Sequence, residues 1–586
     1  MAIIDILETS TDAEKAIEKG NIVLFILIEK NIMKHIIIAT LLLIISAIVT
    51  AQTDKNNTPL EGEWVGIVNL GKEAIYMRLL FKNEEGNTKI VVLSMQPDGI
   101  SAQPTDVNVN SARIQFKLKR NAVQLLFDGK LQGKRLAGNI SSAQGSGVFQ
   151  FVRHLQVDPK LYDEYAGPYE LGSGKFVIIR RGDGLNGAPP FSVGRSWLHY
   201  VDNSGRTRIL FCSSKDKFFS GPSYLVPLPV EVYVAFIRNK EGIVTGLRWR
   251  ENGQAEIFAP RSKLYKEESV HFQNGNITLA ARLLTPTAKG SHPGVVLIQG
   301  GPGPGNRNEQ YLIAGDILAR HGIATLIYDK QGCGGSSGDW RMQSYEDMAK
   351  DALAGVEFLL RRKEIDPNRI GLWGISEGGW IAPIAASRSS DIAFVILISA
   401  AGISHAEVDL ALVEPMLRQA KFSEQEIQEA LAFEKLSINF AQSGKGWDQL
   451  EPLLGGAPEK KWFYHSTIYT HTAGYPPTSK DHWFWTKYRL SADLDPVATL
   501  RKVTCPVLAI WGELDAAMPY RINKKGVEQG LKEGKNKDYT LTVFPKGGHI
   551  LWLEDTGNYI QVKNYVPGYF DTAIKWILKR VRPQSK

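Results

Sequence analysis

Cysteine is scarce in this chain of 586 residues, which contains three. Cys212, Cys333 and Cys505 form no C-x-x-C pair, and their odd number argues against a framework of disulfide bonds. We therefore expect no zinc site built from cysteines. The stability of the protein must come from its hydrophobic cores.

Dense runs of lysine and arginine are lacking too, although the formal net charge is +8. Spread over this length the charge is mild, so we expect no nucleic-acid partner. The hydrophobic content of 43% and the charged content of 22% are those of an ordinary globular protein. The chain is too long for one compact core, and we expect about two to four domains.

The N-terminal region has no apolar run long enough to span a membrane easily. The run Ile36–Val49 has about 14 residues, whereas a spanning helix needs about 20. It follows Met33-Lys34-His35 and precedes the small residue Ala51, which is the order of a secretory signal peptide. We predict that residues 1–51 are a targeting segment, that translation begins at Met33, and that the protein is exported to the periplasm or secreted.

The alternative for this segment is an uncleaved anchor. Asn21–Ile28 would then add further apolar residues in front of Met33. No cysteine follows Ala51, so a lipid anchor is not indicated. Any contact with a membrane would go through this segment alone.

The next part of the chain alternates between apolar and polar residues with a period of two. Ile114, Phe116 and Leu118, for example, alternate with polar neighbours, which indicates a half-buried β-strand. Turn sequences such as Asp128-Gly129 separate the runs. We predict two small all-β modules, over residues 53–157 and 158–264, each a sandwich or small barrel.

From about residue 265 to residue 586, strand and helix patterns alternate. Apolar runs such as Gly294–Ile298 are typical of strands buried on both faces, and helical patterns such as Met342–Arg362 lie between them. This alternation predicts an α/β domain with a mostly parallel sheet. The alternation stops over residues 402–495, where we expect a helical, aromatic-rich cap, and resumes with the strand Pro506–Trp511.

The strongest motif is G-x-S-x-G at residues 374–378, with Ser376 at its centre. It follows the predicted strand Ile370–Trp373 and precedes the predicted helix Glu377–Ser387, a setting that places the serine on a sharp strand-to-helix turn. Such a turn exposes the hydroxyl at a helix N-terminus, where the helix dipole favours negative charge. We therefore predict that Ser376 is a nucleophile.

A serine hydroxyl is a poor nucleophile unless a base takes its proton. His549 is the best candidate, because it lies in a Gly-rich loop after the predicted strand Tyr539–Phe544. The acid that orients the histidine should follow another strand, and Asp515, after the strand Pro506–Trp511, meets this requirement. Glu513 is the alternative acid. The resulting chain order is serine, acid, histidine.

Two backbone N–H groups should hold the oxyanion of the reaction intermediate. One should come from Glu377, next to the nucleophile. The other should come from the Gly-rich loop 299–305, whose two prolines have no N–H. Gly301 is the expected donor and Gly303 the alternative. No Gly-Lys-Ser or Gly-Lys-Thr sequence follows this loop, so it is not expected to bind phosphate.

Residues 265–586 resemble α/β-hydrolases, in particular bacterial exported serine carboxylesterases and the related proline-iminopeptidase-like serine aminopeptidases. The residues that carry the resemblance are QGGPGPGNRNE (299–309), YDKQGCGGSSGDW (328–340), GISEGGW (374–380), CPVLAIWGELD (505–515) and PKGGH (545–549). Those families often have histidine before the oxyanion glycines, where this chain has Gln299. The resemblance does not reach the predicted β modules.

The resemblance implies acyl transfer in two steps. Ser376 attacks a carbonyl while His549 takes its proton, and water later frees the acyl group. We expect no metal and no cofactor, because this mechanism needs neither. We predict an exported serine hydrolase that cleaves carboxylic esters, with a small ester or a short peptide as its substrate.

Two alternative functions stay open. A serine aminopeptidase or dipeptidyl-type peptidase would need acids in its cap to hold a substrate amine. The candidates there are Glu414, Glu424, Glu426 and Glu429. Alternatively, the β modules bind glycans and the hydrolase domain is accessory, for which Trp64 and Trp197 are the hint in the sequence.

Overall fold

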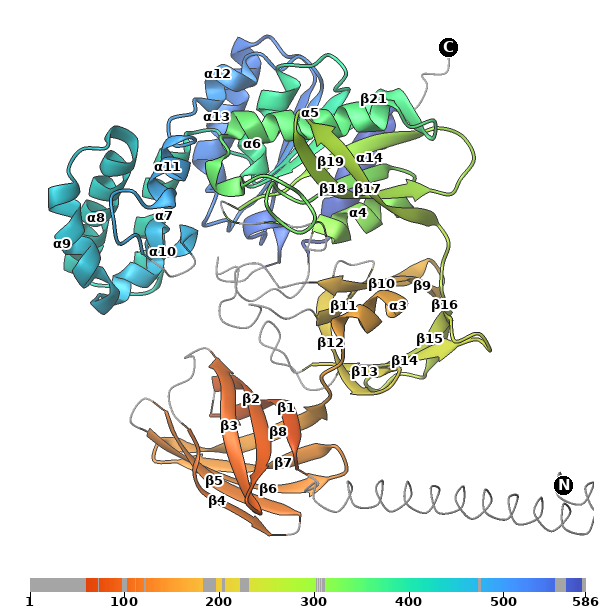
Figure 1. Ribbon diagram of the computed structural model, residues 1–586, viewed down its shortest axis with the longest axis vertical. Helices are drawn as coiled ribbons and strands as arrows, with labels where there is room; N and C mark the ends of the chain where they lie inside the picture. Colours follow the sequence, from red (N-terminus) through yellow and green to blue (C-terminus); the bar gives the residue numbers. More distant parts are fainter. Residues whose placement is uncertain are drawn as a thin grey trace, which may run out of the picture.

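The structure is a computed structural model that describes residues 60–581. Outside the description, within these limits, are residues 72, 97–102, 111, 121–122, 183–196, 203–205, 222–230, 302, 304, 306, 308–310, 473–475 and 554–564. The predicted targeting segment 1–51 also lies outside the described residues. No described helix is both long and apolar enough to cross a membrane. The described chain forms three eight-stranded sheets. Most of the helices belong to the part of the chain that contains the third sheet (Figure 1).

The first sheet is antiparallel, with strand order β3-β2-β1-β8-β7-β6-β5-β4. Its strands are β1 (Gly62–Leu70), β2 (Glu73–Glu84), β3 (Asn87–Gln96), β4 (Thr105–Asn110), β5 (Arg113–Arg120), β6 (Val123–Gln132), β7 (Arg135–Ser142) and β8 (Gly145–His154). The predicted alternation is present in β5, where Ile114, Phe116 and Leu118 are buried and the residues between them are not. One apolar face of each strand thus builds the core of this module.

The second sheet is also antiparallel, with its strands paired in chain order from β9 to β16. The elements of this part are η1 (Pro159–Leu161), α3 (Tyr162–Tyr165), β9 (Gly167–Gly172), β10 (Lys175–Gly182), β11 (Trp197–Asp202), β12 (Thr207–Ser214), β13 (Lys217–Ser220), β14 (Val232–Arg238), β15 (Val244–Glu251) and β16 (Ile257–Pro260). The two end strands meet where Tyr169 bridges to Arg261 and the Ser262 N–H donates to the Pro168 carbonyl at 2.7 Å. The sheet is therefore close to a closed barrel.

The third sheet has the order β17-β18-β20-β19-β21-β22-β23-β24. Its strands are β17 (Tyr265–Asn274), β18 (Ile277–Pro286), β19 (His292–Ile298), β20 (Ala324–Tyr328), β21 (Ile365–Ile375), β22 (Phe394–Ile398), β23 (Val507–Gly512) and β24 (Tyr539–Phe544). The pairs β17–β18 and β18–β20 are antiparallel and all later pairs are parallel. The predicted fold class, an α/β domain with a mostly parallel sheet after two all-β parts, is confirmed. The exact residue boundaries of the parts stay predictions.

Helices cover both faces of the third sheet. They are α4 (Tyr311–Arg320), η2 (Trp340–Met342), α5 (Tyr345–Leu360), α6 (Gly378–Ala386), α12 (Pro496–Leu500), α13 (Tyr520–Glu533), η5 (His549–Leu551) and α14 (Tyr569–Val581). One core, with Met348 of α5 and Ile381 of α6, fills one face, and a second core, with Leu312 of α4 and Ile574 of α14, fills the other. Strands such as β22 are consequently buried along their whole length.

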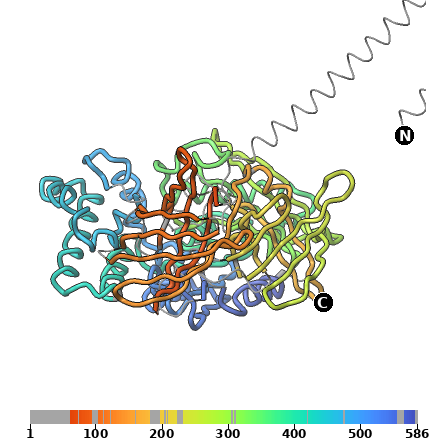
Figure 2. Tube along the Cα trace, turned by 90° about the horizontal axis from the view of Figure 1, so that it is seen from below, coloured from red at the N-terminus to blue at the C-terminus, as the bar shows by residue number. Residues whose placement is uncertain are grey.

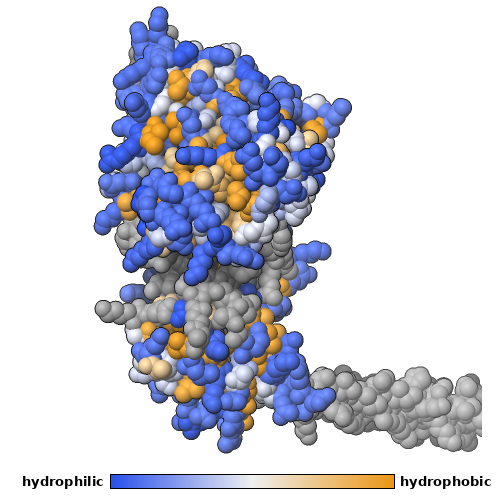
Figure 3. All heavy atoms as spheres, turned by 90° about the vertical axis from the view of Figure 1, so that its left-hand side faces the viewer, coloured by the Kyte–Doolittle hydropathy of each residue, from blue (hydrophilic) through white to orange (hydrophobic). Residues whose placement is uncertain are grey.

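The helical cap lies beside this domain (Figure 1). It comprises α7 (His405–Gln419), α8 (Glu424–Ser443), α9 (Trp447–Gly456), η3 (Ala457–Glu459), η4 (Lys461–His465), α10 (Thr467–His471) and α11 (Trp483–Arg489). Many of its aromatic side chains pack into the cap's own core, among them Phe433, Trp462 and Trp485. Seen from the cap side, hydrophobic side chains are interspersed among hydrophilic ones on the surface (Figure 3), and Leu453 is one of the exposed cap residues.

The second β module lies between the first module and the α/β domain (Figure 1). Seen from below, the strands of the first module lie in front of the other parts (Figure 2). Arg180 of β10 donates through Nε to the Asp316 carboxylate of α4 at 2.7 Å, and both side chains are buried. On the other side, Val65 and Tyr76 of the first module pack with Phe211 of the second. The second module thus has buried contacts with both the α/β domain and the first module.

Candidate active site

Ser376 follows the last residue of β21 and has a φ of 53°, which a non-glycine residue rarely adopts. Its N–H donates to the Ile398 carbonyl at 2.9 Å. A Cβ on Gly374 would lie 2.1 Å from the carbonyl oxygen of Gly378, and one on Gly378 would lie 2.6 Å from that of Ile298. The two motif glycines are therefore needed for the close approach of β21, α6 and β19 that presents the serine.

The structure brings the three predicted residues together, although they are far apart in the chain. His549 Nε2 lies 3.0 Å from Ser376 Oγ. His549 Nδ1 lies 3.1 Å from both carboxylate oxygens of Asp515. With Nδ1–H donating to the carboxylate, Nε2 accepts from the serine hydroxyl, which is the arrangement a general base requires.

Asp515 is buried at the end of the turn after β23 and accepts the Met518 N–H at 2.8 Å. The alternative acid, Glu513, is exposed, and its carboxylate lies 3.4 Å from the Lys546 N–H. Of the two predicted acids, Asp515 is thus the one hydrogen-bonded to His549.

The loop that carries His549 is held by contacts that the sequence did not reveal. Ile550, at φ 54°, donates its N–H to the Ser399 hydroxyl at 3.1 Å. A Cβ on Gly512 would lie 2.2 Å from the Gly547 carbonyl, so the end of β23 must be glycine for the loop to pass this close. Ser399 is fully buried directly after β22. In the sequence, only its position at the end of a predicted strand indicates that it could lie near the site.

The predicted oxyanion loop passes over the nucleophile. A Cβ on Gly300 would lie 2.9 Å from Ser376 Cβ. The Gly300 N–H donates to the Tyr311 hydroxyl at 2.8 Å, so this group is already engaged. Gly301 follows with a φ of 85°, a conformation that favours glycine. The Glu377 N–H stands at the start of α6, beside the serine.

Gln299, which occupies the place of the histidine expected from the resemblance, anchors this loop. Its side chain is buried, and its Nε2 donates to the Tyr328 carbonyl at 2.6 Å. A Cβ on Gly305 would lie 2.2 Å from Gln299 Oε1, so the loop folds back tightly over the amide. The glutamine therefore positions the loop although it is not a histidine.

A buried ion pair that sequence reasoning missed lies behind the nucleophile. Lys330 Nζ is 2.7 Å from the Glu377 carboxylate, and both side chains are almost fully buried. The same ammonium donates to the carbonyl oxygens of Gly301 and, at 3.3 Å, Gly303. Lys330 thus connects the residue after the nucleophile to the predicted oxyanion loop.

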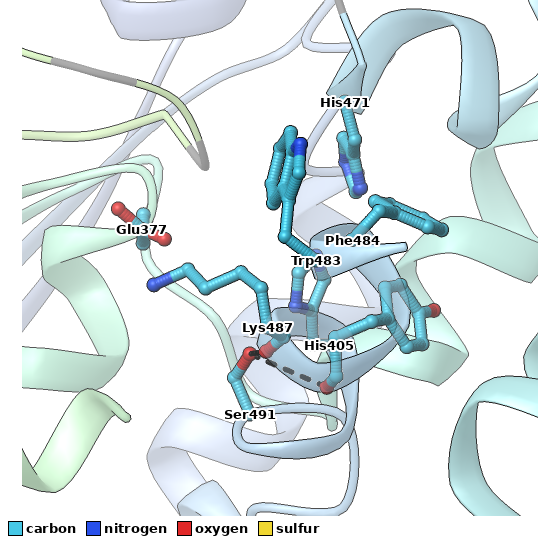
Figure 4. Close-up of a pocket in the computed structure, with 8 residues that line it drawn as sticks. Glu377, His405, His471, Trp483, Phe484, Lys487 and Ser491 are labelled. Carbon is cyan, nitrogen blue, oxygen red and sulfur yellow. Dashed lines mark hydrogen bonds between the residues drawn. The ribbon is translucent and has the colours of Figure 1, made fainter. Parts of the chain in front are cut away.

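A small pocket lies between Glu377 and the cap (Figure 4). Its walls are formed by Glu377, His405, His471, Trp483, Phe484, Lys487, Tyr488 and Ser491. The Lys487 ammonium points toward Glu377 and donates to the Gln343 carbonyl at 2.8 Å. Burial lowers the pKa of Lys487 to about 8. The cap side of the pocket thus combines aromatic rings and histidines with a lysine that points toward Glu377.

The predicted cap acids lie elsewhere and have other partners. Glu414 and Glu424 pair with Arg418. Glu426 closes a capping box at the start of α8 with Ser423. Glu429 pairs with an exposed lysine of η3–η4, Lys460, at 2.8 Å. Among the described residues that line the pocket, the only carboxylate is that of Glu377.

Residues 274–523 match the family described as X-Pro dipeptidyl-peptidase (S15 family). The quorum-quenching protein AidA of Acinetobacter baumannii is 27% identical over 128 residues, which are 22% of this chain and 41% of that protein. The thiohydrolase aneE of Aspergillus aculeatus is 33% identical over 86 residues, 14% of this chain and 27% of that protein. The chain therefore spans less than half the length of these two relatives.

Two solved structures each align with about half of this chain. Est1E of Butyrivibrio proteoclasticus, solved with ferulic acid, is 19% identical, covers 53% of this chain and 99% of its own, and gives a TM-score of 0.34. The hypothetical protein PA2218 of Pseudomonas aeruginosa is 18% identical, covers 55% of this chain and 95% of its own, and gives a TM-score of 0.35. The strand order and the sharp turn at Ser376 give this part of the chain the α/β-hydrolase fold, and residues 274–523 match the family model within it.

Proposed function

We propose that the protein hydrolyses carboxylic esters through an acyl-enzyme, with Ser376 as nucleophile, His549 as general base and Asp515 as the residue that orients the histidine. The observation that carries the proposal is the continuous chain of contacts from the Asp515 carboxylate through the imidazole to Ser376 Oγ. Three side chains at three strand ends meet in the order that nucleophilic catalysis requires.

Each residue has one task in the proposed reaction. Ser376 Oγ attacks the ester carbonyl while His549 Nε2 takes the hydroxyl proton. Asp515 keeps Nδ1 protonated and stabilises the imidazolium. The oxyanion is held by the N–H groups of Glu377 and Gly301. His549 then gives its proton to the leaving alcohol, and a water molecule, activated by the same imidazole, frees the acid.

The charges around the pocket support an ester rather than a peptide with a free N-terminus. A substrate ammonium needs an unpaired carboxylate, yet Glu377 is already neutralised by Lys330 and is approached by Lys487. The cap acids that sequence analysis offered are engaged in pairs and caps away from the pocket. An uncharged acyl group fits the apolar wall formed by Trp483 and Phe484.

A dipeptidyl-type serine peptidase is the second candidate, and the match of residues 274–523 to the X-Pro dipeptidyl-peptidase family favours it. The same triad would then attack a peptide carbonyl, and His549 would protonate a leaving amine. This candidate requires a group that holds the substrate N-terminus, for which Glu377 would have to exchange partners.

One experiment separates the two candidates. The purified protein is first labelled with a fluorophosphonate, which should react with Ser376 and leave Ser376→Ala unlabelled. The same preparation is then assayed with p-nitrophenyl butyrate and with alanyl-prolyl-p-nitroanilide. We expect a higher kcat/KM for the ester. A clear preference for the anilide would replace the esterase by the peptidase, and absence of labelling would contradict both.

Export and glycan binding concern the targeting segment and the β modules. We propose export through residues 1–51, and N-terminal sequencing of the exported protein should find Gln52 first; a start upstream of Met33 would contradict this. Glycan binding by the β modules receives no support from Trp64, which is fully buried. Trp197 is half-buried and packs edge-on against Phe211.

A further inference from the structure

Three metal-binding side chains meet in the cap, at the wall of the pocket. His405 and Asp409 lie one turn apart on α7, so their side chains share one face of the helix. His471 is the last residue of α10 and reaches the same point from the other side. The three ligand atoms lie within 4.8 Å of one another. Both histidines also line the pocket next to the nucleophile (Figure 4).

The spacing of these atoms is too wide for hydrogen bonds between them. His405 Nε2 lies 3.7 Å from Asp409 Oδ2, and His471 Nε2 lies 3.9 Å from Asp409 Oδ1. Ligands of one tetrahedral zinc ion, each about 2.0–2.2 Å from the metal, stand about 3.3–3.6 Å apart, a little closer together than these atoms. The arrangement therefore resembles three ligands around a common centre more than a chain of direct contacts.

The charge of the cap core points the same way. Asp409 is buried and accepts the Tyr488 hydroxyl at 2.7 Å, and Glu434, also buried, accepts the Thr467 N–H at 2.8 Å. Within the described part of the chain, neither carboxyl group forms an ion pair with a lysine or arginine. A buried carboxyl group stays neutral by keeping its proton, and it ionises only with a compensating charge beside it. A bound cation would supply it between α7 and α10.

The contact of His405 with a neighbouring hydroxyl suits a metal ligand. His405 Nδ1 lies 3.1 Å from the Tyr345 hydroxyl, on α5 of the α/β domain. When Nδ1–H donates to this oxygen, Nε2 keeps its lone pair for a metal and the ring is fixed in place.

We propose that His405, Asp409 and His471 bind one divalent transition-metal ion, with Zn²⁺ the best match for two imidazoles and one carboxylate. The ion joins α7 to α10 and fixes the pocket wall that faces Glu377. Its remaining position faces the pocket, where it takes water or an oxygen atom of the substrate. This site is independent of whether the triad acts on esters or peptides.

The test uses the full chain after treatment with a chelator, titrated calorimetrically with Zn²⁺ and, separately, followed by visible absorption with Co²⁺. We expect one equivalent of Zn²⁺ and an intense absorption of low-coordinate Co²⁺. His471→Asn and Asp409→Asn should weaken Zn²⁺ binding at least about 100-fold. The matched control is His465→Asn, a cap histidine that packs against Phe422, and it should keep the wild-type affinity.

Several outcomes would overturn the proposal. Wild-type protein that takes up less than a tenth of an equivalent of Zn²⁺, or a Co²⁺ spectrum identical to that of the aqueous ion, excludes the site. Equal loss of affinity in His471→Asn and His465→Asn would place the ion elsewhere. If the Asp409 variant does not fold by circular dichroism, the wild-type Co²⁺ spectrum still decides. Esterase assays enter only afterwards, so failure of the proposed function would not be mistaken for failure of the site.

Discussion

The ammonium of Lys330 lies 2.7 Å from the carboxylate of Glu377, the residue that directly follows Ser376. The pair is buried, and Lys330 also holds carbonyl oxygens of the loop at residues 301–303. It therefore joins the two segments from which the oxyanion donors should come. Lys330 should therefore help to position both expected donors, although its described hydrogen bonds go to Glu377, Gly301 and Gly303 and not to the triad.

We expect Lys330→Met to lower kcat/KM for an ester substrate about 10- to 100-fold, mainly through kcat. The loop at Gly301 loses its anchor, and removal of one oxyanion donor alone costs about 10²-fold or more. The variant also removes the direct ion-pair partner of the buried Glu377 carboxylate, which destabilises the fold by up to about 3–5 kcal/mol. Steady-state kinetics and urea unfolding measure the two effects.

The matched control for this prediction is Lys350→Met. Lys350 pairs with Asp347 at 2.8 Å on the surface of α5, so its loss should change neither rate nor stability noticeably. The double variant Lys330→Met with Glu377→Gln should regain stability but not kcat. Wild-type kcat in Lys330→Met would show that the lysine has no part in positioning the loop.

Ser376→Ala should lower turnover by about 10⁴-fold or more, and His549→Asn should do the same. Because both act in one proton transfer, the double variant should be no worse than either single variant. His321→Asn is the control, since His321 is exposed at the end of α4, with Nδ1 2.8 Å from the Ile317 carbonyl. Additive losses in the double variant would mean that the two residues act separately.

The meeting of these residues could be predicted from the sequence because each lies at a strand end next to glycines. Gly374 and Gly378 flank Ser376, and a glycine pair precedes His549, so local patterns alone located them. In a parallel sheet all such strand ends share one edge. The geometry of the site then follows from topology, without knowledge of side-chain packing.

The contacts that depend on packing could not be predicted. Lys330 looked like one charged residue in a Gly-rich turn, and its partner Glu377 was expected to contribute only its N–H. In the cap, sequence analysis offered exposed acids of α7 and α8, whereas the buried ones are Asp409 and Glu434. Helical periodicity does not separate an acid on the solvated face from one that the aromatic core of the cap encloses.

The buried carboxyl group of Glu434 should make stability depend on pH. Burial raises the pKa of Glu434 from 4.5 to about 7. The folded protein therefore holds this proton between pH 4.5 and pH 7, where the unfolded chain has lost it. Stability falls as the pH rises through this window, by at most about 3 kcal/mol, and stays lowered above it.

Glu434→Gln should remove this dependence, because the amide can still accept the Thr467 N–H and does not ionise. We expect the variant to match the wild type near pH 5 and to be the more stable protein at pH 8. Unfolding midpoints of both proteins at the two pH values measure the effect. Glu429→Gln, at an exposed position paired with Lys460, serves as the control. A variant that is less stable than the wild type at pH 8 would contradict the assigned direction.

The buried pair of Arg180 and Asp316 should couple the second β module to the hydrolase domain. Arg180→Met leaves Asp316 buried without its partner, so we expect a loss of about 3–5 kcal/mol and faster proteolysis near the junction at residue 264. The double variant Arg180→Met with Asp316→Leu should recover most of this loss, because a well-packed apolar pair can replace a buried ion pair. Arg113→Met, which removes a mostly exposed pair with Asp128, should leave the stability nearly unchanged. If Arg180→Met unfolds like the wild type, the second β module and the hydrolase domain are stabilised independently. The ion pair then contributes little to the stability of either.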